Sequence, residues 1–190
     1  MWGRNRPSLS TEDGTSPRPA EFWLGVKMHH DKSHRGNASQ FFVAGELCRR
    51  GYAALVTVGN TPNTDILCSN KDGSRFVHIQ VKTFVPGTKT CSVGAKAEKN
   101  PGTRFFWVLA GIPQPGSNLP FEYFIIPAAV MAKNVAAHHG RWLAIPGQKG
   151  QPHKDSPVRA VAVATGAPPY FWSVEAYRDK WDLLERELDA

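Results

Sequence analysis

The feature that most constrains the fold is a short turn flanked by two stretches with strand patterns. Residues 64–68 and 75–83 are rich in β-branched and other apolar side chains, and the Asp72-Gly73 pair between them is typical of a hairpin turn. The sequence therefore predicts an antiparallel hairpin whose register is centred on this pair.

The register of this hairpin brings polar side chains together. Asp65 and Gln80 each lie seven positions from the turn pair, one on each strand, so they are expected to be cross-strand partners. Such partners point to the same face of a sheet, and alternation along the second strand adds Lys82 and His78 to that face. We expect Asp65, Gln80 and Lys82 to meet at one end of the hairpin. A strand histidine such as His78 is more often packed against its neighbours than used in a site.

The chemistry of this group fits a phosphodiester-cleaving site. The Asp65 carboxylate, the Gln80 amide oxygen and the backbone carbonyl of Val81 are ligands that Mg²⁺ accepts while keeping several waters, and Mn²⁺ could take its place. The Lys82 ammonium group is suited to orient or deprotonate an attacking water and to offset charge on the phosphate. The alternative is an ordinary solvated sheet face.

The rest of the chain predicts helices around further strands. Residues 37–50 carry apolar side chains at helical spacing, with Asn37 placed as the N-cap and Gly51 as the terminator, behind a polar loop at 31–36. The other expected elements are strands at 51–58, 105–110 and 122–126, a helix from Pro127 to about residue 137, a loop at 147–157, and an amphipathic helix at 173–188. This order predicts an α/β fold with a mixed central sheet flanked by helices.

Length and composition fit one globular domain behind a polar tail. The chain has 190 residues, 41% of them hydrophobic, which is enough for one ordinary core. Residues 1–20 are rich in Pro, Ser and Arg and are expected to be a disordered tail, followed by a single domain at 21–190. Three widely spaced cysteines, Cys48, Cys68 and Cys91, indicate neither a disulfide framework nor a thiolate metal site, which favours a reducing, cytoplasmic location. No apolar run is long enough to suggest a membrane span.

Charge favours a polyanionic partner without identifying it. The formal net charge is +7, which suits phosphate neutralisation, although many basic proteins bind nothing anionic. Arg49, Arg50 and Lys71 could contact phosphates, but single basic residues at a helix end or a turn tip are more often ordinary surface.

Histidines and tryptophans offer weaker hypotheses. His29, His30 and His34 lack a second ligand pair at zinc spacing. Base stacking by tryptophan is possible, but scattered positions favour core packing. The tryptophans considered are Trp23, Trp107, Trp142, Trp172 and Trp181.

Three stretches together resemble the PD-(D/E)xK nuclease superfamily. They are residues 36–51 (GNASQFFVAGELCRRG), Thr64-Asp65 and residues 79–83 (IQVKT), and they follow the helix, hairpin and half-motif order of that superfamily. The QxK form is similar to small restriction-endonuclease-like and intron-encoded homing nucleases, with Holliday-junction resolvases as more distant relatives. The resemblance covers residues 32–85, and beyond them it rests on the strand-strand-helix order.

The resemblance implies a restriction-endonuclease-like core and roles for individual residues. Asp65 resembles the metal-binding aspartate, Gln80 the variable second ligand and Lys82 the lysine of the motif. It further implies action on DNA by a homodimer or higher homo-oligomer, since cleavage of two strands suits paired sites.

One departure from the family pattern concerns the first helix. Relatives commonly carry a glutamate four residues after the glycine equivalent to Gly36, whereas this chain has Gln40. Asp65 is then the only sure carboxylate, and a site with one negative charge holds a divalent cation more weakly than one with two or three. Glu46 lies six residues further along the helix, about 240° around its axis, and is expected to point elsewhere.

Three functions remain open from the sequence. The first is a metal-dependent DNA endonuclease that uses Asp65, Gln80, Lys82 and Gln40. The second, favoured by Gln40, is a catalytically inactive nucleic-acid-binding or assembly module that retains the nuclease fold. The third is a protein-interaction domain with an aromatic surface, for which no salt-sensitive affinity for nucleic acid is expected.

Overall fold

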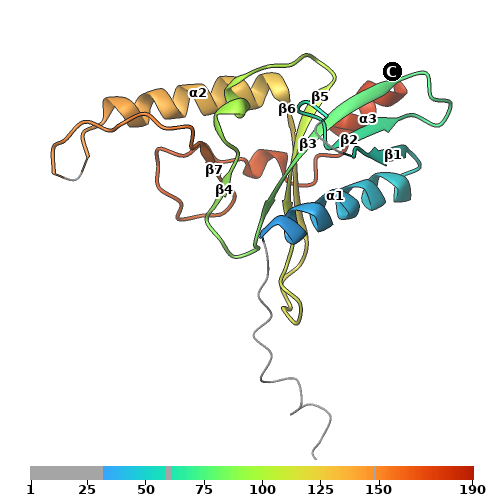
Figure 1. Cartoon of the computed structure of the whole chain (residues 1–190), viewed down its shortest axis with the longest axis horizontal. Helices are drawn as coiled ribbons and strands as arrows, with labels where there is room; N and C mark the ends of the chain where they lie inside the picture. Colours follow the sequence, from blue (N-terminus) through green and yellow to red (C-terminus); the bar gives the residue numbers. More distant parts are fainter. Residues whose placement is uncertain (1–31, 59–60, 148) are drawn as a thin grey trace, which may run out of the picture. The chain divides into compact units, whose positions relative to one another are not determined.

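A five-stranded mixed sheet forms the centre of the fold, in the order β1-β2-β3-β5-β6 (Figure 1). The computed structural model describes residues 32–58, 61–147 and 149–190, so the expected tail and the expected start of the domain lie outside the described residues. The strands of this sheet are β1 (Ala53–Val56), β2 (Ile66–Ser69), β3 (Phe76–Phe84), β5 (Phe105–Gly111) and β6 (Glu122–Pro127). Strands β3 and β5 run parallel and all other neighbours antiparallel. The expected α/β class with a mixed central sheet is confirmed.

The β2–β3 hairpin has the predicted register. Ile66 lies opposite Ile79 and Ser69 opposite Phe76, which is the pairing centred on the Asp72-Gly73 pair. The turn itself is wider than two residues. The Gly73 N–H donates to the carbonyl of Asn70 at 3.2 Å, and Gly73 has a φ of 71°, a left-handed conformation that glycine adopts without strain.

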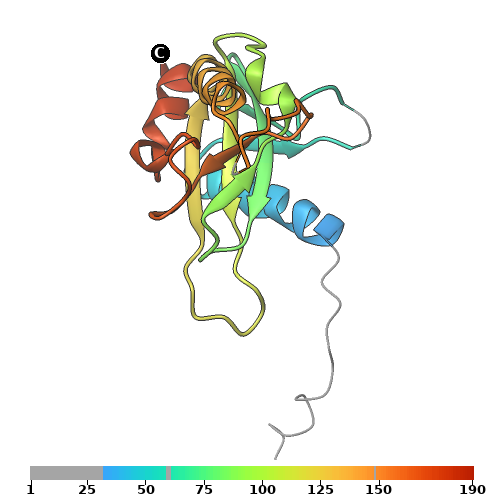
Figure 2. The ribbon, with the colours of Figure 1, turned by 90° about the vertical axis from the view of Figure 1, so that its left-hand side faces the viewer.

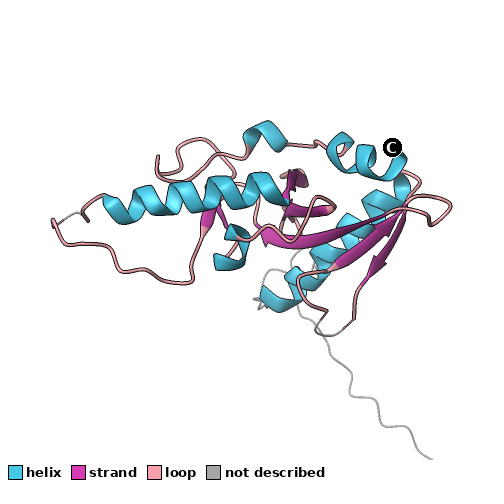
Figure 3. Cartoon of the chain, turned by 90° about the horizontal axis from the view of Figure 1, so that it is seen from above, coloured by secondary structure: helices cyan, strands magenta, loops and turns pink. Residues whose placement is uncertain are grey.

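Helices cover both faces of the sheet (Figure 2), and the sheet separates two hydrophobic clusters. Helix α1 (Lys32–Arg49) and helix α3 (Asp182–Asp189) pack on the face that carries the odd-numbered residues of β3. Helix α2 (Ala128–Ala144) lies on the other face, against β5 and β6 (Figure 3). Among the described residues, no helix is both long and apolar enough to cross a bilayer.

Two helices differ in length from the prediction. Helix α1 begins at Lys32, so a polar loop at 31–36 and an N-cap at Asn37 were wrong; lysine and arginine are good helix formers, and polarity in an exposed first turn does not exclude a helix. Helix α2 continues beyond residue 137 to Ala144. Its last turns have tertiary partners that the sequence did not indicate, such as the carbonyl of Tyr170, 3.2 Å from His138 Nδ1.

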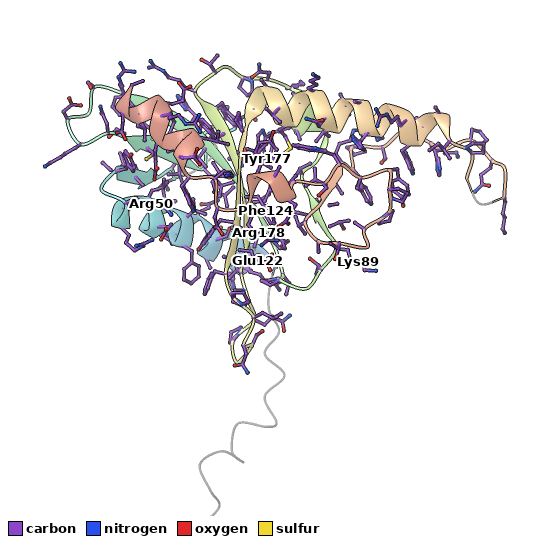
Figure 4. The ribbon with its side chains drawn as sticks, turned by 180° about the vertical axis from the view of Figure 1, so that it is seen from behind. Arg50, Lys89, Glu122, Phe124, Tyr177 and Arg178 are labelled. Atoms are coloured by element: carbon purple, nitrogen blue, oxygen red, sulfur yellow. The ribbon has the colours of Figure 1, made fainter. Side chains whose placement is uncertain are left out.

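The expected helix at 173–188 was also wrong, because the chain breaks in its middle. A 3₁₀ helix (Glu175–Tyr177) and α3 are separated by Asp179, which has a φ of 51° and donates its N–H to the carbonyl of Tyr123 at 2.8 Å. Before it, Arg178 forms a β-bridge with Phe124 of β6 and places its guanidinium carbon 4.6 Å from that ring's centroid (Figure 4). Pairing with the edge of the sheet therefore replaces the helical hydrogen bonds at this point.

A second, two-stranded sheet was not predicted. Strand β4 (Thr90–Ser92) pairs antiparallel with β7 (Ala160–Ala162). Three-residue strands are too short for alternation to be visible in a sequence. A 3₁₀ helix (Ala95–Glu98) follows β4 and packs against α2, so this segment covers the even-numbered face of β3.

Candidate functional site

Asp65 is held by the backbones of two neighbouring strands. It directly precedes β2, its N–H donates to the carbonyl of Ile79 at 2.9 Å, and its carbonyl accepts the N–H of Thr57 at 2.9 Å. The Thr57 hydroxyl also donates to the carbonyl of Thr64 at 2.6 Å. Backbone hydrogen bonds therefore hold Asp65 in place independently of its side chain.

The Asp65 carboxylate meets β3 at Gln80 and Val81. Its Oδ2 accepts the backbone N–H of Val81 at 2.7 Å and a hydrogen bond from Nε2 of Gln80. All three residues are at least half-buried. The structure therefore brings Asp65 and Gln80 together as the register predicts, while their role in chemistry stays a prediction.

Lys82 lies on the same face of β3 as Gln80 but does not bond to Asp65. Its Nζ is 6.0 Å from the centroid of the Trp107 ring on β5, and among the described residues no carboxylate lies within ion-pair distance of it. The Lys82 charge also acts on the buried thiol of Cys91, whose pKa burial raises to about 12 while the ammonium group acts in the opposite direction. No carboxylate of the described residues therefore competes for the ammonium group.

The oxygen atoms at this point fit a hard cation. Oδ1 of Asp65 and Oε1 of Gln80 accept no hydrogen bond from any described residue. The N–H and carbonyl of one strand residue point to the same side, so the carbonyl of Val81 is directed to the edge where Asp65 binds its N–H. Binding by both side chains requires the Gln80 amide to turn, because its nitrogen faces the carboxylate.

The negative charge at this site is low. Within the described ranges, no group of three or more His, Cys, Asp or Glu side chains is placed to hold a metal ion. The donor set of Asp65, Gln80 and Val81 is thus suitable in atom type for Mg²⁺ or Mn²⁺ but carries a single formal charge, which predicts weak binding.

The first helix contributes no described bond to this site. Gln40 is half-buried on α1 and its side chain makes no hydrogen bond to a described residue, so its proposed role stays a prediction. Its neighbour Ser39 is fully buried and shares a 2.6 Å hydrogen bond with the hydroxyl of Thr83, which ties α1 to β3 two residues beyond Val81.

Glu46 and the basic residues near it form a separate surface network. Glu46 accepts bonds from Arg49 at 2.7 Å and from Arg50 at 2.9 Å, and the hydrogen bond from Arg49 is the main reason that its pKa is lowered. Arg50 also pairs with Glu185 of α3 at 3.0 Å. Glu46 is therefore engaged at the end of α1, as expected, and Arg50 ties α1 to α3.

The remaining candidates divide between surface and core. His78 is exposed, with Nδ1 3.2 Å from the hydroxyl of Thr64, and Lys71 is exposed at the hairpin tip. Trp107 and Trp181 are 3% and 2% exposed, which confirms core packing for both. Trp142 is half-buried, and Trp172 packs against the cluster beneath α2. His29, His30 and Trp23 lie outside the described residues.

Two features of the structure have no signal in the sequence. One is Trp107 as the neighbour of Gln80 and Lys82, which depends on the parallel pairing of β3 with β5. The other is a cavity of about 260 Å³ beneath the end of α2, where Arg159 is buried and bonds Glu98 at 2.5 Å. Because this cavity forms between segments far apart in the chain, no local pattern could have indicated it.

Comparison with known proteins gives a distant structural likeness. No protein-family model matches the chain, and no curated protein sequence matches it. A solved structure described as that of a bacterial homing endonuclease, I-Ssp6803I, is similar with a TM-score of 0.49 and 14% identity, over 83% of this chain and 94% of that one. The chain is a mixed α/β protein with a polar site at the start of β2.

Proposed function

We propose that this chain is a metal-dependent endonuclease that hydrolyses phosphodiester bonds in DNA. The observation that carries the proposal is the approach of Asp65 to Gln80 and Val81 at the strand edge, with Lys82 on the same face and free of a described carboxylate. The +7 charge supports a polyanionic substrate. These features resemble the PD-(D/E)xK pattern in its QxK form.

The proposed roles follow from the atoms present. Asp65, Gln80 and the Val81 carbonyl would hold Mg²⁺ or Mn²⁺, which supplies a Lewis acid when bound. Hydrolysis forms a bond from water oxygen to phosphorus and breaks the bond to one ester oxygen, which leaves with a proton. Lys82 orients the attacking water and offsets the charge that develops on the phosphoryl oxygens.

The decisive experiment compares the wild type with Lys82→Ala on supercoiled plasmid and on branched and single-stranded DNA, with Mg²⁺ or Mn²⁺. We expect the substitution to lower cleavage by about 10²-fold or more, because it removes a charge that acts on the transition state. Lys71→Ala is the matched control, since Lys71 is exposed at the hairpin tip. Equal cleavage by wild type and Lys82→Ala would contradict the proposed site.

A cleavage-inactive nucleic-acid-binding or assembly module is the second candidate. Gln40 and the single formal charge of the site favour it, as does the pairing of the Asp65 carboxylate with two protein donors. Salt-sensitive DNA binding without product under either metal would select this function. A homodimer or higher homo-oligomer stays part of the nuclease proposal, because cleavage of both strands needs two sites.

A further inference from the structure

Trp107 occupies a fixed place beside the candidate site. The parallel pairing of β3 with β5 sets Trp107 next to Gln80 and Leu109 next to Lys82. Residues adjacent across two paired strands point to the same face, so the Trp107 ring lies on the face that carries both polar side chains. Trp107 is 3% exposed and packs with its strand neighbour Phe105, at 6.2 Å between ring centroids. Its ring is therefore immobilised by the core.

Among the described residues, the Trp107 ring offers the Lys82 ammonium group an electron-rich face that attracts a cation. Its Nζ lies 6.0 Å from the Trp107 centroid, at the outer limit of a cation–π contact. In the part of the chain that the structure describes, no carboxylate forms an ion pair with Lys82. A flexible four-carbon side chain without such a partner would otherwise sample many rotamers.

The indole N–H of Trp107 is unusual for a buried donor. Nε1 is fully enclosed, and among the described residues no group accepts its hydrogen. Buried donors are nearly always paired, so a simple packing role does not explain why an indole stands at this position in place of phenylalanine or leucine. The large electron-rich ring is the property that a neighbouring cation can use, since tryptophan is the best partner in cation–π contacts.

We propose that Trp107 is a positioning residue for Lys82, whose ammonium group it holds over the face that carries Gln80. The expected effect of Trp107 on cleavage rests on the proposed function. The contact between ring and ammonium group stands on geometry alone and has its own measurement.

The contact is tested first, without any activity. The indole resonances of the full chain, labelled with ¹⁵N tryptophan, are recorded for the wild type, Lys82→Met and Lys71→Met, and Trp107→Phe identifies the resonance of Trp107. Its unpaired N–H makes this resonance sensitive to a nearby charge. We expect Lys82→Met to shift it and Lys71→Met to leave it in place. An unchanged resonance in Lys82→Met would overturn the contact.

Positioning is tested by kinetics in two variants. Trp107→Met fills much of the space without an aromatic face, and it is expected to lower kcat by about 5- to 30-fold, the equivalent of about 1–2 kcal/mol, with KM for DNA unchanged. Trp107→Phe retains a ring and is expected to stay within about threefold of the wild type. Thermal melting confirms that each variant is folded. If Trp107→Met is unfolded, Trp107→Phe is compared with Trp107→Leu instead. A smaller loss of kcat in Trp107→Phe than in Trp107→Leu supports the positioning role, and equal losses contradict it.

The outcomes separate the two proposals. If the wild type cleaves and Trp107→Met keeps its full kcat, the positioning role is wrong while the nuclease stands. If the wild type does not cleave, the proposed function has failed, and the resonance shift still decides whether Trp107 holds Lys82.

Discussion

Asp65 is the residue on which the candidate site depends, and among the described residues no second carboxylate joins it in a metal-binding group. Its Oδ2 is occupied by Gln80 and the Val81 N–H, whereas Oδ1 accepts no bond from a described residue. A cation at this place would meet one full negative charge and two neutral oxygens. Metal affinity, more than the geometry of the protein, is therefore expected to limit activity.

If residue 40 faces the site, Gln40→Glu is expected to supply the negative charge that the metal site lacks. An added carboxylate should lower the Mg²⁺ or Mn²⁺ concentration that gives half-maximal cleavage by about tenfold, because affinity for hard cations rises with ligand charge. Titration of cleavage with metal, together with calorimetry, measures the effect. Gln114→Glu in the exposed β5–β6 loop is the matched control. An identical metal requirement in Gln40→Glu and the wild type would remove Gln40 from the site.

At the scale of elements, two segments show how local pattern and tertiary contact compete. The β2–β3 hairpin keeps the register that its turn residues predict, since a shift by one residue would turn Val77 and Ile79 out of the core. The C-terminal segment does not keep its helical pattern. Its bridge from Arg178 to Phe124 completes the pairing of β6 and leaves α3 to begin at Asp182.

This break predicts an unusual order of stabilities at Asp179. Residue 179 adopts a left-handed conformation, in which Cβ is disfavoured. The free energy of unfolding of Asp179→Ala should therefore be lower than that of Asp179→Gly by about 1 kcal/mol. Urea denaturation of both variants measures the difference. Glu187 within α3 is the control position, where the Glu187→Ala variant should be more stable than Glu187→Gly by about 1 kcal/mol. A continuous helix would give the helical order at both positions.

At the scale of the whole molecule, two hydrophobic clusters lie on opposite faces of one sheet. The first is covered by α1 and α3 and the second by α2 and the β4–β7 sheet. The proposed nuclease site lies where β2 begins, apart from the cavity of Arg159, and its proposed substrate is a long polyanion. The excess of basic residues has a direct consequence for such a substrate.

We expect duplex DNA to bind with strong salt dependence. Neutralisation of about four phosphates would weaken binding by roughly 10²-fold between 50 and 200 mM salt. Fluorescence anisotropy with a labelled duplex measures the slope, and Lys71→Ala and Lys82→Ala show which of the two lysines contributes to it. Affinity that does not respond to salt would favour a protein-interaction domain instead.

The sequence by itself determined the hairpin, its register and the meeting of Asp65 with Gln80, because turn chemistry and alternation act over neighbouring residues. It also indicated the mixed sheet and the helices around it, although not their ends. Only the tertiary structure decided the break at Asp179, the short β4–β7 sheet, the placement of Trp107 beside Lys82 and the turn of the Gln80 amide toward Asp65. The first three depend on contacts between segments far apart in the chain, whose energies no local pattern contains. The orientation of the Gln80 amide depends on which end of that amide can donate to the carboxylate, which alternation along a strand does not specify.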